Sequence, residues 1–207
     1  MRQTVNQSKD VDRWTGVGSA VCVPLLGAVY IGCGAIGLSL RDRAVGEALV
    51  PVEPYVSICR LIMLLLVADL VVLFSFIHAQ ASHDRKTYTL AALAFVVVFA
   101  VIAGVNTFLL LTIAPLAESK PELEMLFSYR WPSVNLALDL FAWGPVLGLG
   151  LLFAAAAFEK RNLERLVRLG LTLAGLLCRG NILCFMSEDA RFSILGIIGY
   201  DLVLPID

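Results

Sequence analysis

Five charged residues stand inside long apolar runs, where a charge is costly unless it is paired or has a function. They are Arg60, Asp69, Asp139, Arg179 and Asp201. An aspartate in such a place can carry protons or bind cations, and the planar guanidinium of arginine suits carboxylate or phosphate groups. These residue types therefore predict either ion pairs that fasten helices together or a polar site that binds a small ligand.

The apolar runs that hold these charges have the length of membrane-spanning helices. Of 207 residues, 59% are hydrophobic and 16% are charged, and the mean hydropathy is +0.84. Soluble domains carry about 25% charged residues, whereas about 20 apolar residues cross a bilayer as one helix. The sequence therefore predicts an all-α fold, a polytopic transmembrane helix bundle that forms a single domain over residues 1–207.

About six spans are expected, joined by short polar links. Their predicted limits are 16–40, 56–79, 88–116, 134–158, 166–186 and 194–207. The last span has thirteen residues up to Ile206, or about 20 Å of helix, against a hydrocarbon core of about 30 Å. We expect it to be truncated; a short re-entrant helix, or a helix end covered by another subunit, is the alternative.

The basic residues between the spans predict the orientation, because cytoplasmic loops are enriched in lysine and arginine. With the N-terminus inside, nine fall on the cytoplasmic side: Arg2, Lys9, Arg13, Arg85, Lys86, Lys160, Arg161, Arg165 and Arg168. Five fall on the opposite side: Arg41, Arg43, Lys120, Arg130 and Arg191. The bias predicts a cytoplasmic N-terminus.

In this orientation, four of the intramembrane charges share the outer half of the bundle. Arg60 and Asp139 would lie about 6 to 8 Å below the outer boundary. Arg179 and Asp201 would lie about 10 Å below it. Two interpretations remain open: the arginines pair with the aspartates, or all four line a cavity for a small polar or anionic ligand.

Asp69 is predicted near the middle of the membrane, with no basic residue one helical turn away. It could serve proton or cation transport. It could equally form a hydrogen bond with Asn106 or Thr107 of the third span. The sequence leaves these two hypotheses level.

Small residues at four-residue spacing predict close helix contacts, because lipid supplies little hydrophobic drive between helices. The candidates are Ala28 and Gly32, Ala100 and Gly104, and Gly144 and Gly148. A dimer face and ordinary packing within one bundle would both use them, and we favour ordinary packing.

Sequence motifs for catalysis, metal binding or nucleotide binding are not found. The chain has no G-x-S-x-G, H-E-x-x-H or Walker A motif, and its cysteines form no C-x-x-C pair. No metal site is predicted, and no cofactor is indicated. The net charge of -1 gives no basic surface for nucleic acid.

The C-terminal third resembles small bacterial polytopic membrane proteins of an uncharacterised family. The resemblance is carried by 131–139, 142–144, 148–154, 163–165, Arg168, 174–178 and 196–205. It implies a bacterial plasma membrane and a last helix that continues beyond Asp207. The family has no assigned activity that could be transferred.

These observations favour a non-enzymatic integral membrane protein, an accessory or scaffold subunit of a larger membrane assembly. Its expected partners are lipid, other membrane subunits or a second copy of the chain. A small transporter or ligand-binding protein that uses the intramembrane Asp and Arg residues is the alternative, and an intramembrane enzyme is the third hypothesis.

Overall fold

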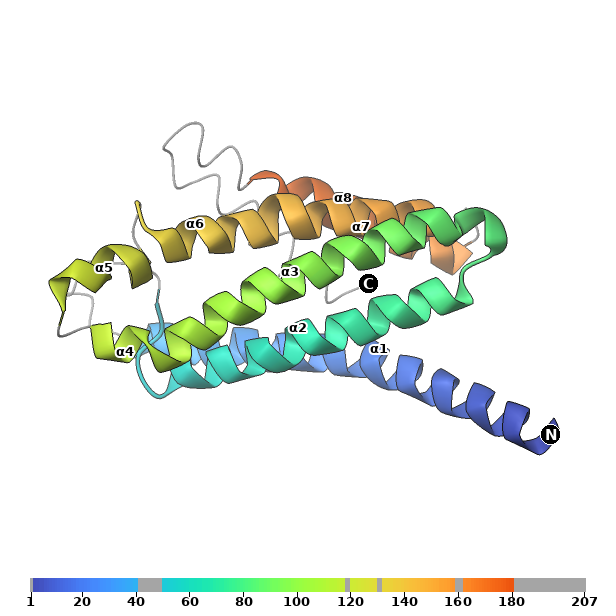
Figure 1. The fold of residues 1–207 in the computed structure, drawn as a ribbon, viewed down its shortest axis with the longest axis horizontal. Helices are drawn as coiled ribbons and strands as arrows, with labels where there is room; N and C mark the ends of the chain where they lie inside the picture. Colours follow the sequence, from blue (N-terminus) through green and yellow to red (C-terminus); the bar gives the residue numbers. More distant parts are fainter. Residues whose placement is uncertain (1, 41–49, 118–119, 130–131, 159–161, 181–207) are drawn as a thin grey trace.

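The computed structural model describes residues 2–40, 50–117, 120–129, 132–158 and 162–180, and all regular structure in these ranges is helical (Figure 1). The α-helices are α1 (Arg2–Ser39), α2 (Tyr55–Gln80), α3 (Lys86–Thr112), α4 (Ala114–Ala117), α5 (Pro121–Phe127), α6 (Val134–Phe141), α7 (Leu147–Ala157) and α8 (Asn162–Cys178). A 3-10 turn, η1 (His83–Arg85), precedes α3. A π-helical segment, η2 (Ala142–Val146), joins α6 to α7. The predicted all-α class is confirmed for the described residues.

Within the described residues, four helical segments are long and apolar enough to cross a membrane: Trp14–Ser39, Tyr55–Gln80, His83–Leu116 and Val134–Ala157. They agree with the first four predicted spans within five residues at each end. Within the predicted fifth span, α8 ends at Cys178. The predicted sixth span lies outside the described residues.

The long helices pack mainly in chain order. Their extensive contacts run from α1 to α2, from α2 to α3, from α3 to α7 and from α7 to α8, and Figure 1 shows the helices side by side in this order. The loop between α2 and α3 is short, so these two helices are antiparallel neighbours. Because α3 contacts α2 on one side and α7 on the other, it lies at the centre of the described bundle.

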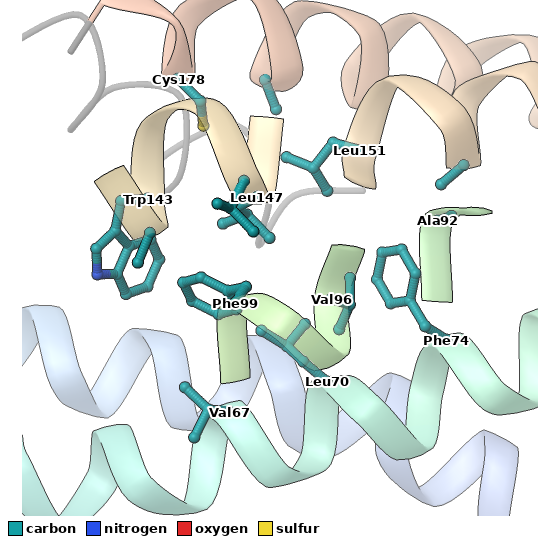
Figure 2. Packing of buried hydrophobic residues seen from close by; sticks show 14 of the residues in the cluster. Val67, Leu70, Phe74, Ala92, Val96, Phe99, Trp143, Leu147, Leu151 and Cys178 are labelled. Atoms are coloured by element: carbon teal, nitrogen blue, oxygen red, sulfur yellow. The ribbon is translucent and has the colours of Figure 1, made fainter. Parts of the chain in front are cut away.

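The apolar core lies where α2, α3 and α7 meet (Figure 2). Its largest fully buried side chains include Leu70, Val96, Phe99, Leu147 and Leu151. The ring of Phe99 meets Trp143 of η2 edge-on, with centroids 4.8 Å apart. Close packing of these side chains fixes how α2 and η2 sit on α3.

The wide turn of η2 surrounds a proline. Pro145 has no backbone N–H to donate to the preceding turn, which removes one α-helical hydrogen bond inside this apolar segment. A π-helical turn of this kind accommodates the missing bond. Trp143 and Val146 of this turn are buried in the core.

Polar bonds hold the helices at the end that carries the loop between α2 and α3. His78 Nδ1 and Thr89 Oγ1 are hydrogen-bonded at 2.8 Å, joining α2 to α3. Arg85 Nη1 donates to the carbonyl oxygen of Ala156 at 2.6 Å, which ties the loop to the end of α7. The bundle is therefore fastened by side-chain bonds at this end as well as by its core.

Two glycines allow α7 and α8 to pack backbone to backbone. A Cβ at Gly175 would lie 2.8 Å from the carbonyl oxygen of Gly148, and a Cβ at Gly148 would lie 3.0 Å from that of Gly175. A side chain at either position would force the helices apart. Gly148, which the sequence marks as a packing residue, here contacts another helix of the same chain.

The substitution Gly175→Ala is expected to lower the free energy of unfolding by about 1 to 3 kcal/mol, because the added methyl overpacks this contact. Gly32→Ala is the matched control, since a Cβ at Gly32 of α1 meets nothing within 4 Å. Unfolding in mixed detergent micelles measures both variants. Equal stability of the two would contradict the close contact between α7 and α8.

Candidate functional site

Arg60 is anchored on the neighbouring helix through a backbone carbonyl. Its Nη1 donates to the carbonyl oxygen of Leu110 of α3 at 2.9 Å. Its Nε is buried and has no hydrogen-bond partner in the described structure. The side chain thus uses part of its donor capacity to join α2 to α3 and retains one unsatisfied donor.

Asp139 of α6 is held by the indole of Trp143, which hydrogen-bonds its carboxylate. The two residues are four apart, so one helical turn brings the side chains together. Trp143 is buried in η2, where it also packs against Phe99. The core therefore fixes the donor that orients the Asp139 carboxylate.

Tyr129 lies within the electrostatic reach of both charges. Its pKa is raised above the ordinary tyrosine value, first because the hydroxyl is buried and second because Asp139 carries a negative charge nearby. The positive charge of Arg60 and a hydrogen bond from the Asn135 side chain act in the opposite direction. Arg60, Asn135 and Asp139 therefore all act on Tyr129, and we call these four residues the polar cluster.

Asn135 connects the start of α6 to two other segments. Its backbone carbonyl accepts from Asn106 Nδ2 of α3 at 3.4 Å, and its own Nδ2 donates to the carbonyl oxygen of Ser128 at 3.5 Å. Asn135 is only 1% exposed, and its Oδ1 has no hydrogen-bond partner in the described structure. This residue thus has the second unsatisfied atom of the polar cluster.

The local sequence explains why Asn135 reaches this position. Ser133 caps α6, because its Oγ accepts from the backbone N–H of Leu136 at 3.1 Å. The same hydroxyl donates to the carbonyl oxygen of Ser128 at 2.6 Å. The cap therefore ties the start of α6 to the segment that carries Tyr129, and Asn135 follows in the first turn.

Asp69 lies away from the polar cluster, nine residues or about 14 Å along α2 from Arg60. It precedes Phe76 by seven residues, and the Phe76 ring occupies the space that a Cβ at Gly16 of α1 would take. Asp69 is therefore on the side of α2 that packs against α1. Its Oδ2 is buried and has no partner in the described structure.

The sequence suggested two hydrogen-bond partners for Asp69, and one of them bonds to a different residue. Asn106, one of its two candidate partners, donates instead to the backbone of Asn135. Thr107, the other candidate, is buried on α3.

The remaining predicted charges do not extend the polar cluster within the described residues. Arg179 is exposed just beyond α8, where its Cγ lies 3.8 Å from the position of a Cβ at Gly148. Asp201 lies outside the described residues. Of the four charges predicted to converge, the structure places Arg60 and Asp139 around Tyr129.

The predicted packing residues fall into two groups. Gly144 is buried in η2, Ala100 is half-buried, and a Cβ at Gly104 would lie 3.8 Å from Val67 Cγ2 of α2. Ala28 is exposed, and Gly32 has open space where its Cβ would be. The first group contacts neighbouring helices, as Gly148 does, whereas the α1 pair faces away from the described bundle.

Sequence reasoning missed two members of the polar cluster. Tyr129 fits an interfacial aromatic belt. Its local sequence does not show that it lies near Arg60, which belongs to a helix far away in the sequence. Asn135 had a usable signal, since it lies one helical turn before Asp139 and follows the capping residue Ser133. Among the described residues, no three His, Cys, Asp or Glu side chains are grouped so that they could hold a metal ion.

Comparisons with protein-family models, with curated proteins and with solved structures find no match to this chain. The resemblance to an uncharacterised bacterial membrane family therefore stays a prediction.

The substitution Trp143→Phe is expected to lower the free energy of unfolding by about 1 to 3 kcal/mol, because the buried carboxylate of Asp139 loses its donor. Trp14→Phe is the matched control, since Trp14 is 74% exposed. Removing the acceptor as well, with Asp139→Leu, should recover part of the loss. Unfolding in mixed micelles measures all three, and an unchanged Trp143→Phe variant would contradict the bond.

Alkaline pH is expected to destabilise the protein through Tyr129. Its pKa is raised in the folded state, so Tyr129 adds to the free energy of unfolding in full below about pH 10. This contribution is lost as the pH rises above the pKa that the tyrosine has in the unfolded chain. Unfolding free energies measured between about pH 8 and about pH 11 should fall less steeply for Tyr129→Phe than for the wild type. Parallel curves would show that Tyr129 ionises alike in both states.

Proposed function

We propose that this chain is a non-enzymatic, multi-pass integral membrane protein that serves as an accessory or scaffold subunit of a larger membrane assembly. The observation that carries the proposal is the use of the polar cluster. Arg60 and Asn135 bond to other segments of the same chain, and Asp139 bonds to Trp143 one helical turn further on. Charges used in this way fasten helices and need no substrate to justify their burial.

The surface of α1 supports a role in assembly. Little of its membrane-spanning part is buried, and its extensive contacts are with α2. Large apolar side chains are exposed along it, including Val21, Leu25 and Val29. A Cβ at Gly18, Gly32 or Gly34 would meet nothing within 4 Å. Such a surface suits lipid, another membrane subunit or a second copy of the chain.

The finer topology belongs to the same proposal. We infer about six spans with the N-terminus in the cytoplasm of a bacterium and the chain in the inner membrane. The distribution of lysine and arginine supports the orientation, and the resemblance of the C-terminal third supports the bacterial membrane. In this topology the polar cluster lies in the outer half of the membrane, and the bond between Arg85 and Ala156 lies on the cytoplasmic side.

A second candidate function, a small transporter or ligand-binding protein, is favoured by Asp69. A buried carboxylate oxygen without a hydrogen-bond partner is costly. Near the middle of a predicted span, such a group is suited to binding a transported cation or proton. This candidate differs from the first in requiring a small solute rather than a partner protein.

Native mass spectrometry of the complex, extracted gently from its native membrane, tests both candidates. A mass well above two copies of the 22.5 kDa chain, with a second polypeptide present, is the result expected for a subunit of an assembly. The purified chain alone, extracted in the same detergent, is the control for mass added by detergent and lipid.

A monomer or dimer that retains a small molecule would contradict the subunit role and favour the transporter or ligand-binding function. The substitution Asp69→Asn should then abolish retention of that molecule. A monomer or dimer that retains nothing under extraction conditions shown to preserve known complexes would contradict both candidates.

A further inference from the structure

Two buried atoms of the polar cluster have opposite hydrogen-bonding character. Arg60 Nε is a donor and Asn135 Oδ1 is an acceptor, and both are without a partner in the described structure. Leaving a buried polar group unsatisfied costs about 1 to 3 kcal/mol, and here two are left in one place. A bound group that satisfied both atoms would remove both costs.

The anchors of these two residues bring them to the same part of α3. Arg60 bonds to the carbonyl of Leu110, and the Asn135 backbone bonds to the side chain of Asn106. Asn106 and Leu110 are four residues apart, so they are on one face of α3, about 6 Å apart along its axis. Tyr129, whose pKa responds to a hydrogen bond with Asn135 and to the charge of Arg60, lies near both residues.

The orientation of the Asn135 amide is set by its neighbours. Its nitrogen donates to the carbonyl oxygen of Ser128 at 3.5 Å. Exchanging the nitrogen and oxygen would place Oδ1 against the Ser128 carbonyl, two acceptors together. The free atom of Asn135 is therefore an acceptor, and it cannot be satisfied by flipping the amide.

The occupant that fits must accept a hydrogen bond from Arg60 and donate one to Asn135. Carboxylate and phosphate groups only accept, and an ammonium group only donates. A hydroxyl does both with a single oxygen atom. Asp139, whose negative charge acts on Tyr129 in the same cluster, also disfavours an anion there.

We propose that the polar cluster binds a hydroxyl group between Arg60 Nε and Asn135 Oδ1. Its source is a slowly exchanging water molecule or the head group of a hydroxyl-bearing lipid. A buried water needs two to four polar partners, and Arg60 Nε and Asn135 Oδ1 supply two. The inference goes beyond the proposed subunit role and does not depend on it.

Two measurements on the intact purified protein distinguish the sources. Native mass spectrometry compares retention of phosphatidylglycerol, whose head group ends in hydroxyls, with phosphatidylethanolamine, whose head group ends in an ammonium. Radiolytic footprinting, after rapid mixing into water labelled with a heavy oxygen isotope, follows oxygen added to Tyr129. Bound water that exchanges slowly leaves the light isotope on Tyr129, whereas bulk water leaves the heavy one.

Two variants test the residues themselves. Asn135→Leu removes the acceptor at similar volume, and Arg60→Lys removes Nε while it keeps the charge. Ser75→Ala is the matched control, because the exposed Ser75 hydroxyl bonds to its own helix at the carbonyl of Val71. Circular dichroism confirms that each variant retains its helices before it is compared.

The expected result is preferential retention of phosphatidylglycerol, or light-isotope labelling of Tyr129, that is lost in Asn135→Leu and Arg60→Lys and kept in Ser75→Ala. The first outcome identifies a lipid hydroxyl and the second a water molecule. If the wild type gives neither signal, the proposal is overturned, and this conclusion does not depend on any variant. A signal that persists in both cluster variants overturns it as well.

Discussion

No water fills the hydrocarbon core of a bilayer, so a polar side chain there must bond to protein or remain unsatisfied at a cost of several kcal/mol. Arg60 and Asn135 of the polar cluster meet this constraint in part through bonds to other segments of the chain, while each retains one unsatisfied atom. Arg60 of α2 bonds to a carbonyl of α3, and Asn106 of α3 bonds to the backbone of α6. The need to satisfy these groups therefore fixes how α2, α3 and α6 meet.

The rest of the described bundle depends on α3, which lies between α2 and α7. Phe99 packs at its centre against Trp143, and the same indole holds the Asp139 carboxylate. Apolar packing and polar bonding are thus linked through one side chain. Trp143 lies in the π-helical turn around Pro145, one helical turn after Asp139.

The two ends of the row of helices differ in their surfaces. Between α7 and α8 the backbones touch through Gly148 and Gly175, so this contact is complete within the chain. The glycines of α1 that face away from α2 have open space around them, and apolar side chains stand between them. Lipid can cover such a surface without cost, and so can another helix with small residues of its own. The proposed subunit role rests on this difference together with the internal use of the polar cluster.

Hydropathy and length in the sequence determined the all-α class and the limits of the four helices that could span a membrane, because a run of apolar residues is a local property. Gly148, which the sequence marks by its one-turn spacing from Gly144, lies at a close contact with α8. The surroundings of Arg60 and Asp69 were decided by the tertiary structure alone, whereas the partner of Asp139 lies one helical turn along the same segment. Arg60 meets the Leu110 carbonyl, and Asp69 faces α1 rather than Asn106, because such bonds depend on the rotation and register of helices that are distant in sequence. The same reason explains Tyr129. It lies in a link between helices, so its position depends on the helices that the link connects. The local sequence does not show which residues of other helices lie near it.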